Sequence, residues 1–367
     1  MSIDRRTLLG ALGTTVAAGL AAPAGAADAK TTPAQRPAAS PSKAKVIDVH
    51  THMYSRRWQE QLKAANDENV KVRPGPNGDS MVYRWAPIGS LGPDMFDWDA
   101  RIAKMDAAKV DIALISLSAP NVYWGTREIS AQAARDINDE FAAAQHKYDG
   151  RVRWFASLPW SNADDAIAEL RRAKKQGAVG VCTLTNILGT ALTDERYRTI
   201  WREIEAMRMP TFIHPTLPFN DGMGLNGGAL ANAIGFTTET SLCFSRMIVE
   251  GFMDAFPKLD MIACHGGGAL PFLAARIDRC WDKMIPEKKN KDAPTSYLQR
   301  LYFDSIVYDQ KTMDHLVDFV GAARVLYGSD YPFSLGDMPG ILARVDALPA
   351  EQRDKVRSGN AQKLFDL

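Results

Sequence analysis

The sequence contains few cysteines and no excess of charge of either sign. Its four cysteines form no CxxC pair, which excludes a disulfide scaffold and a zinc site built from thiolates. The 44 basic and 43 acidic side chains leave a formal charge of +1, so the chain offers no cationic surface for a nucleic acid or an anionic membrane. A bound metal must therefore be held by histidine and carboxylate side chains.

The N-terminal segment is expected to lie outside the folded domain. Arg5 and Arg6 precede an uncharged stretch that ends in the small residues Ala24-Gly25-Ala26, and this order predicts a twin-arginine export signal over residues 1–26. The alternative is a disordered N-terminus with a chance arginine pair. The stretch is shorter than the roughly 20 apolar residues that a membrane span requires. The composition of residues 27–44 predicts a disordered linker. Because of the predicted export signal, we expect a periplasmic or otherwise exported protein.

Residues 45–367 are expected to form a single catalytic domain of the α/β class. Short apolar runs alternate with longer helical stretches, which is typical of parallel strands buried on both faces. The pattern favours a (β/α)8 TIM barrel over a doubly wound open sheet, because no glycine-rich phosphate loop follows the first strand. The predicted strands cover residues 46–49, 112–117, 152–157, 179–183, 211–213, 261–264, 301–304 and 325–327, and the predicted helices cover residues 129–146, 164–176, 194–207, 238–256 and 312–320.

Two segments rich in glycine and proline interrupt this pattern. Asp67 to Asp97 and Pro215 to Gly235 both follow predicted strands at the end of the barrel where catalytic loops gather. We expect them to be substrate-binding loops or lids. Within the first segment, the side chains of Trp85 and Phe96 either line the pocket or simply pack against their neighbours.

Four of the six histidines lie at the carboxyl ends of predicted strands. His50 and His52 end the first strand, and residues two apart in an extended chain point the same way. His214 ends the fifth strand, His265 ends the sixth, and Asp330 follows the eighth. A single histidine at such a place is more often a packing residue than a ligand, but in a barrel all these ends meet at one face. Their shared position favours one common site.

These side chains have the chemistry of a metal site with an adjacent proton donor. Three neutral imidazoles and one carboxylate suit zinc or another divalent first-row metal and leave a position open for water or substrate. We assign His50, His52 and His214 as nitrogen ligands and Asp330 as the oxygen ligand. His265 then acts as acid or base beside the metal-bound water, whose pKa a cation lowers to about 7. We count Asp330 with His265 as catalytic.

From about Lys45 to the end, the sequence resembles the amidohydrolase-related family. The resemblance implies a (β/α)8 barrel, a single zinc or manganese ion on the four ligands above, and His265 as the catalytic acid or base. It also implies cleavage of a carbon–carbon bond with loss of CO2, usually in a homodimer. The resemblance rests on Ile47-Asp48-Val49-His50-Thr51-His52, Ile213-His214-Pro215, residues 265–272, Gly328-Ser329-Asp330-Tyr331-Pro332-Phe333 and Ser358-Gly359-Asn360-Ala361.

The resemblance further implies two arginines that bind the substrate carboxylate. Arg276 follows His265 at the spacing of a family arginine that crosses the dimer interface, and Arg84 is the nearest candidate for the second. The alternative for Arg276 is an ion pair on the helix surface with Asp278 or Asp282.

The sequence therefore predicts a metal-dependent decarboxylase of a small unsaturated or aromatic carboxylic acid. A metal-dependent hydrolase of a lactone or amide in the same pocket is the alternative, because the resemblance covers enzymes of both kinds. A third hypothesis is a periplasmic protein that binds metal without catalysis. The identity of the substrate stays open.

Overall fold

The structure, a computed structural model, describes residues 44–75, 78–83, 86–216 and 228–367. The export signal predicted for residues 1–26 and residues 27–43 of the predicted linker lie outside the described residues. In the described part of the chain, no helix is long and apolar enough to cross a membrane.

Eight parallel strands form the central sheet, and each lies where the sequence predicts a strand. The strands are short and mostly buried on both faces, because helices cover them outside and side chains fill the space inside. The predicted (β/α)8 barrel is therefore confirmed. In sheet order the strands are β1 (Ile47–His52), β5 (Ile112–Ser116), β6 (Val152–Ser157), β7 (Gly180–Leu184), β10 (Thr211–His214), β11 (Met261–Ala263), β12 (Tyr302–Asp304) and β13 (Val325–Leu326).

Hydrogen bonds between β1 and the segment after β13 close the barrel. The backbone N–H of Asp330 donates to the carbonyl oxygen of His50 at 2.8 Å. The buried carboxylate of Asp48 accepts hydrogen bonds from the backbone N–H and the hydroxyl of Ser329. This seam ties the strand that carries His50 and His52 to the segment that carries Asp330.

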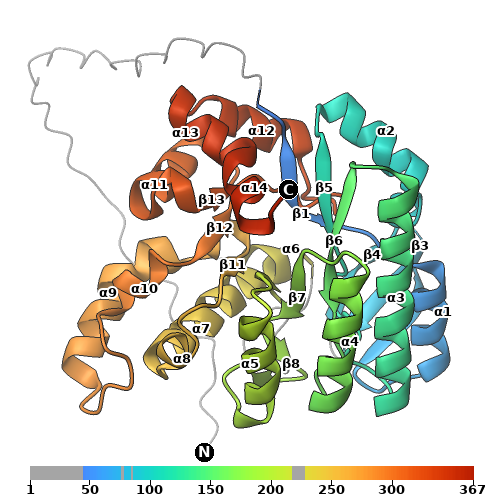
Figure 1. The fold of residues 1–367 in the computed structure, drawn as a ribbon, viewed down its shortest axis with the longest axis horizontal. Coiled ribbons are helices and arrows are strands. Elements are labelled where there is room, and N and C mark those ends of the chain that lie inside the picture. The colour runs from blue at the N-terminus through green and yellow to red at the C-terminus, as the bar shows by residue number, and fades with distance from the viewer. Residues whose placement is uncertain (1–43, 76–77, 84–85, 217–227) are drawn as a thin grey trace, which may run out of the picture. The chain divides into compact units, whose positions relative to one another are not determined.

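Helices lie around the outside of the strands (Figure 1). Several begin at a side chain that caps the first turn, as Thr126 does by accepting from the N–H of Ile129. The helix predicted for residues 238–256 is interrupted, because Gly251 adopts a left-handed φ of 75°. The helices are α1 (Arg56–Ala65), α2 (Trp98–Ala108), α3 (Arg127–Lys147), α4 (Ala163–Lys175), α5 (Arg198–Ala206), α6 (Gly228–Leu230), α7 (Phe236–Val249), α8 (Phe252–Ala255), α9 (Leu270–Met284), α10 (Pro294–Leu298), α11 (Gln310–Val320), α12 (Met338–Asp346), α13 (Ala350–Asp354) and α14 (Asn360–Phe365).

The interior of the barrel is filled by its own apolar cluster. The rings of Phe155 and Phe212 stack with their centroids 5.2 Å apart, and Phe365 of α14 packs edge-on against Phe155 at 5.5 Å. Each buried phenylalanine contributes roughly 1.5–3 kcal/mol to folding. Because side chains fill the interior, the carboxyl ends of the strands form the floor of a site rather than the entrance to a pore.

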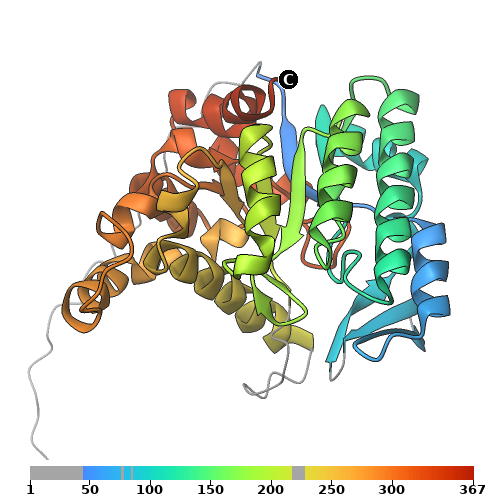
Figure 2. The same cartoon turned by 60° about the horizontal axis from the view of Figure 1, so that its bottom comes forward.

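The first insertion is more regular than predicted. Residues 67–97 were expected to form loops, but they contain a three-stranded antiparallel sheet of β2 (Val70–Gly75), β3 (Gly78–Tyr83) and β4 (Ala86–Leu91). Glycine and proline within these strands obscure the alternation that normally marks a strand. The sheet lies beside α1 at one edge of the barrel (Figure 2). Of the second insertion, residues 228–235 are helical and residues 217–227 lie outside the described residues.

Candidate metal centre and active site

Side chains from several strand ends converge at one end of the barrel. Donor atoms of His50, His52, His214 and Asp330 lie within 4.8 Å of one another, and all four residues are buried. The Nε2 atoms of His50 and His52 lie 3.4 and 3.3 Å from Oδ1 of Asp330. The ring centroid of His214 lies 5.2 Å from that of His50 and 4.9 Å from that of His52. The structure thus brings together the four residues that the sequence predicts as ligands, hereafter the His3Asp cluster.

An oxygen atom holds the Nδ1 atom of each histidine in the His3Asp cluster. Nδ1 of His50 lies 2.6 Å from Oδ2 of Asp304. Nδ1 of His52 lies 3.0 Å from the hydroxyl of Ser116, and Nδ1 of His214 lies 2.7 Å from the carbonyl oxygen of the next residue. A proton on Nδ1 places the lone pair on Nε2. All three rings can therefore present Nε2 to a common centre.

The centre of the His3Asp cluster fits a cation. Among the residues that the structure describes, Nε2 of His50, Nε2 of His52 and Oδ1 of Asp330 are buried without a hydrogen-bond partner. Such atoms are costly when they stay unpaired, and one divalent ion satisfies all of them at once. Imidazole nitrogen suits zinc, and a mixed nitrogen and carboxylate set also accepts manganese. The residues present therefore fit a divalent metal.

Burial and neighbouring charges set the protonation of the His3Asp cluster. Burial lowers the pKa of His52 to about 4 and that of His214 well below its ordinary value, so both rings are neutral near pH 7. Burial would raise the pKa of Asp330, but the surrounding histidines, His265 above all, hold it well below its usual range. Burial also opposes a proton on His50, yet the neighbouring carboxylates of Asp304 and Asp330 raise its pKa well above the ordinary value. The carboxylates of Asp304 and Asp330 therefore favour positive charge at the centre of the cluster.

His265 stands beside the cluster on a left-handed turn. Its Nε2 lies 3.6 Å from Oδ2 of Asp330, and its side chain is 14% exposed. The φ of His265 is 55°, and residues 266–268 also have positive φ. Gly268 is required for a second reason, because a Cβ there would lie 2.3 Å from the carbonyl oxygen of Thr237. The turn places the imidazole within reach of a molecule bound at the cluster.

Two residues that support the site were not identified from the sequence. Asp304 at the end of β12 is buried and bonded to His50, which helps to hold its pKa below the ordinary value although burial acts in the opposite direction. Arg101 of α2 is buried and donates to the hydroxyl of Thr51 and the carbonyl oxygen of His52. The signal for Asp304 was its place at a strand end. Nothing in the local charge pattern distinguishes Arg101 from a surface arginine.

A second group of possible donor atoms lies directly beneath the cluster. Donor atoms of His50, Cys264 and Asp304 are within 4.8 Å of one another. The Nδ1 of His50 already bonds to Asp304, and burial raises the pKa of the Cys264 thiol to about 12. A neutral thiol is a poor ligand, so this group supports His50 rather than forming a separate metal site.

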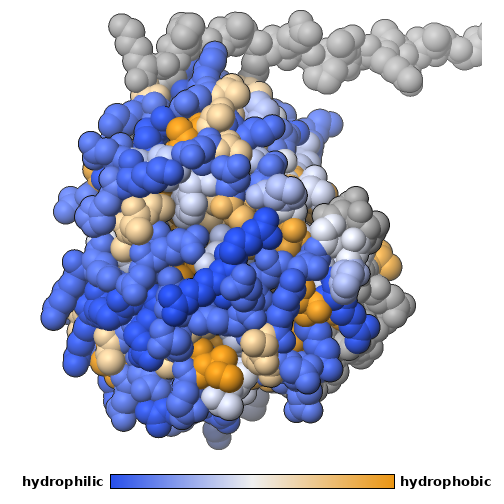
Figure 3. Space-filling view, turned by 90° about the vertical axis from the view of Figure 1, so that its right-hand side faces the viewer, coloured by the Kyte–Doolittle hydropathy of each residue, from blue (hydrophilic) through white to orange (hydrophobic). Residues whose placement is uncertain are grey.

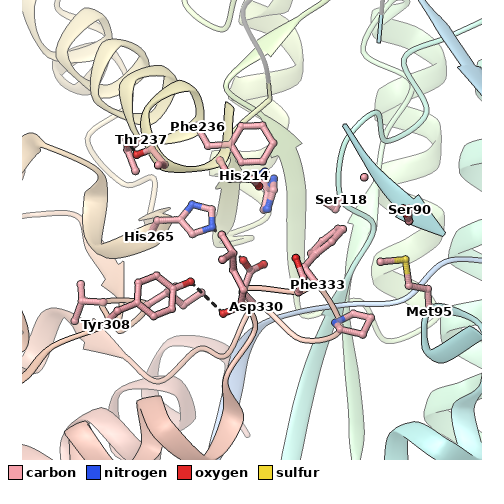
Figure 4. Close-up of a pocket in the computed structure, with 18 of the residues that line it drawn as sticks. Ser90, Met95, Ser118, His214, Phe236, Thr237, His265, Tyr308, Asp330 and Phe333 are labelled. Carbon is pink, nitrogen blue, oxygen red and sulfur yellow. Dashed lines mark hydrogen bonds and ion pairs between the residues drawn. The ribbon is translucent and has the colours of Figure 1, made fainter. Parts of the chain in front are cut away.

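A cavity of about 1000 Å3 opens above the cluster. Figure 4 shows His214, His265 and Asp330 facing it. Phe236 of α7 and Phe333, which packs on His52 at 5.2 Å between ring centroids, contribute aromatic walls. The described residues that line the cavity include no arginine and no lysine. A substrate carboxylate therefore meets no cationic side chain from this part of the chain.

The first insertion lines the cavity with other residues than those singled out in the sequence. Residues between Gly89 and Met95 form part of the wall. Arg84 and Trp85 lie outside the described residues. Phe96 is not part of the wall but packs under the guanidinium of Arg56, which lies 3.8 Å from its ring centroid. For Phe96 the packing alternative holds.

Arg276 is exposed on α9 and does not line the cavity of its own chain. Asp278 accepts hydrogen bonds from Thr295, and Asp282 pairs with Lys283 at 2.8 Å. Within the described ranges, neither carboxylate forms the ion pair with Arg276 that was the alternative. The guanidinium is thus available to a partner outside this chain.

Comparisons with known proteins agree with the barrel fold. An amidohydrolase family model matches residues 47–367. The 2-amino-3-carboxymuconate-6-semialdehyde decarboxylase of Dictyostelium discoideum is 27% identical over 336 residues, which cover 88% of this chain and 91% of that protein. The gamma-resorcylate decarboxylase of Rhodococcus jostii is 29% identical over 291 residues, which cover 73% and 87%. The crystal structure of 5-carboxyvanillate decarboxylase from Novosphingobium aromaticivorans, complexed with manganese and 4-hydroxy-3-methoxy-5-nitrobenzoic acid, has a TM-score of 0.76 at 23% identity, over 89% of this chain and 97% of that one.

The family match spans the whole barrel. It begins at the first residue of β1 and includes the His3Asp cluster, His265 and the supporting carboxylate of Asp304. The chain therefore belongs to the amidohydrolase family.

Proposed function

We propose that this protein is a metal-dependent carboxy-lyase that removes CO2 from a small unsaturated or aromatic carboxylic acid. The observation that carries the proposal is the His3Asp cluster, with unpaired Nε2 atoms turned inward and His265 beside it at the floor of a cavity. Two curated relatives support it, because their names are those of decarboxylases of an unsaturated and an aromatic acid. The aromatic walls at Phe236 and Phe333 suit a planar substrate.

Zinc is the proposed ion, with manganese as the alternative. His50, His52 and His214 would hold it through Nε2, and Asp330 through its carboxylate. When bound, the ion supplies positive charge that polarises substrate oxygens and stabilises negative charge on the substrate as CO2 departs. Metal analysis of protein purified without added metal, followed by activity after reloading with each ion, distinguishes the two.

His265 is the proposed proton donor. Decarboxylation replaces a carboxylate with hydrogen, so a proton must reach the carbon that loses CO2. The bond between that carbon and the carboxylate breaks, its electron pair stays on the carbon, and this pair takes the proton from Nε2 of His265. Water then returns a proton to the imidazole. Because Nε2 lies only 3.6 Å from Asp330, a substrate held at the cluster has its reacting carbon close to this donor.

A homodimer is proposed to complete the site. A substrate carboxylate calls for a cationic partner, and Arg276 points from α9 toward solvent. Phe272, four residues earlier and on the same helical face, is 85% exposed. Met284 of α9 and Leu242 of α7 are 74% and 48% exposed. Burial of these side chains against a second copy would bring Arg276 to an interface, while Arg84 is the proposed second carboxylate ligand.

The opposite side of the molecule has no comparable group of exposed hydrophobic residues in the view of Figure 3. On the side where α1, α2 and α3 lie, the surface is mostly hydrophilic and its hydrophobic residues form small separate patches (Figure 3). This difference favours α7 and α9 as the dimer face. Sedimentation of the wild type and of Phe272→Asp tests it, and a monomeric wild type would contradict it.

Action in the periplasm is proposed from the order of charged, apolar and small residues in positions 1–26. Replacement of both Arg5 and Arg6 by lysine should block export through the twin-arginine route. Cell fractionation of the two forms measures the outcome, and equal export of both would contradict the proposal.

The decisive experiment measures CO2 release from hydroxybenzoates and muconate semialdehydes with metal-loaded protein. We expect turnover with at least one acid, and loss of turnover in His265→Asn with the metal retained. Acid release from lactones or amides without CO2 would instead identify a hydrolase. No turnover with any of these compounds, and no kinetic effect of the variant, would indicate a metal-binding protein without catalysis.

A further inference from the structure

Asp304 connects the proposed ligand His50 to the turn that carries His265. Its carboxylate is fully buried at the end of β12. Oδ2 lies 2.6 Å from Nδ1 of His50 and accepts from the backbone N–H of His265 at 2.8 Å. Oδ1 accepts from the N–H of Gly266 at 2.9 Å and from that of Ile306 at 3.1 Å. Four donors thus converge on one side chain.

We propose that Asp304 is a positioning residue that fixes the tautomer of His50 and the left-handed turn of His265 together. The oxygens of Asp304 already accept from three backbone N–H groups, so they act as acceptors toward His50 as well. A proton then lies on Nδ1 of His50, and Nε2 faces the metal. The same oxygens hold the N–H groups of His265 and Gly266, whose φ values are 55° and 60°. A histidine with positive φ is strained and needs such anchors. This inference rests on the metal site of the proposed function.

The other two rings of the cluster lack this double connection. Nδ1 of His52 faces the neutral hydroxyl of Ser116, and Nδ1 of His214 faces a backbone carbonyl. Ser116 also lies within reach of the carbonyl oxygen of Thr51, a group on the same strand as His52. Hydrogen bonds to charged acceptors are about twice as strong as those between neutral groups. Loss of Ser116 should therefore perturb one ring, and loss of the Asp304 charge should perturb two functional groups.

The test variant is Asp304→Asn, which keeps the shape and replaces one oxygen with an NH2 group. If the NH2 occupies the Oδ2 position, it donates to Nδ1 of His50, moves the ring proton to Nε2 and opposes the N–H of His265. If it occupies the Oδ1 position, it faces two backbone N–H groups and gains no bond to His50, so the first orientation is favoured. We expect zinc affinity, measured by competition with a chromophoric chelator, to fall about 10- to 100-fold. The zinc affinity of Ser116→Ala should fall less. Asp318→Asn, the same change at an exposed position of α11, should bind zinc as tightly as the wild type.

Two further readouts separate positioning from a general loss of structure. Nitrogen-15 NMR of the zinc-loaded wild type should show His50 protonated on Nδ1, whereas metal-free Asp304→Asn should show it protonated on Nε2. At saturating zinc, Asp304→Asn should still lose kcat while KM is unchanged, because the turn of His265 has lost its anchor. A role confined to packing would lower thermal stability without changing the tautomer.

Equal zinc affinity of Asp304→Asn and the wild type would overturn the inference, as would zinc bound through Nδ1 of His50. If the variant does not fold, the NMR spectrum of the zinc-loaded wild type tests whether the proton of His50 lies on Nδ1. Neither the zinc affinity nor the tautomer of His50 needs turnover to be measured. A wild type that binds zinc and releases no CO2 from any acid would therefore overturn the proposed function and leave the assignment of Asp304 to be judged by affinity and tautomer.

Discussion

The floor and the walls of the cavity are built in different ways. The floor consists of strand ends, where each ring of the His3Asp cluster is held at Nδ1 by a second group. The walls come from segments between the strands, including residues 89–95 of the first insertion and Phe236 of α7. The floor is therefore set by the hydrogen bonding of the barrel, whereas the walls can change without disturbing it. The chemistry belongs to the first region and the choice of substrate to the second.

Removal of the metal from the floor should lower activity more than any other change. We expect CO2 release to fall at least about 1000-fold after chelation, because a bound cation contributes several kcal/mol to charge stabilisation and each 1.36 kcal/mol is tenfold in rate. Zinc or manganese should restore it, with magnesium as the control for a harder ion. Full activity in protein shown to be metal-free would rule out the floor as the reacting region.

Loss of the proton donor should have the next largest effect. His265→Asn should lower kcat by about 100- to 10,000-fold, the range of general acid catalysis, and leave the metal content unchanged. His315→Asn is the matched control, because that ring stacks on Phe319 of α11 and lies outside the cluster. Near-normal kcat in His265→Asn would remove this residue from the mechanism.

Asp48, in the seam between β1 and the segment after β13, should make the free energy of unfolding depend on pH. Burial raises the pKa of Asp48 to about 6. Because the folded state then binds this proton more tightly than the unfolded state, wild type should lose stability relative to Asp48→Asn as pH rises from about 4 to 7, by up to about 3 kcal/mol. Urea unfolding of both metal-free proteins across this range measures the difference. A difference that stays constant with pH would contradict the prediction.

Changes in the walls, to which the proposed dimer would add Arg276 of the second copy, should have the smallest effects and act on binding. Arg276→Ala should raise KM about tenfold, the scale of one hydrogen bond to a charged group, with little change in kcat. Arg279→Ala, an exposed arginine on the same helix, is the control. At substrate concentrations below KM, mixed dimers of Arg276→Ala and His265→Asn should be more active than either variant alone, since one site then has both residues. No recovery on mixing would place Arg276 outside the neighbouring site.

Much of the floor could be predicted because its residues lie at the ends of regular elements. Apolar runs mark the strands, and the step from such a run to His214 or His265 places the side chain at the catalytic end. Asp304 occupies an equivalent position, but a single aspartate after a strand gives no sign of its four hydrogen bonds. Arg101 comes from a helix distant in the sequence, so its burial against β1 depends on packing alone. The sheet of β2–β4 was missed because glycine and proline hide its alternation.

The sequence by itself determined the eight strands, several of the helices between them and the set of imidazoles and carboxylate at the strand ends, because local periodicity and strand direction specify these features. Only the tertiary structure decided which oxygen contacts Nδ1 of each histidine and which φ values orient His265. It also decided that the described residues lining the cavity include no arginine and no lysine. Those features depend on distances between residues far apart in the chain, such as the 2.6 Å between His50 and Asp304. Such distances are set only when the barrel closes.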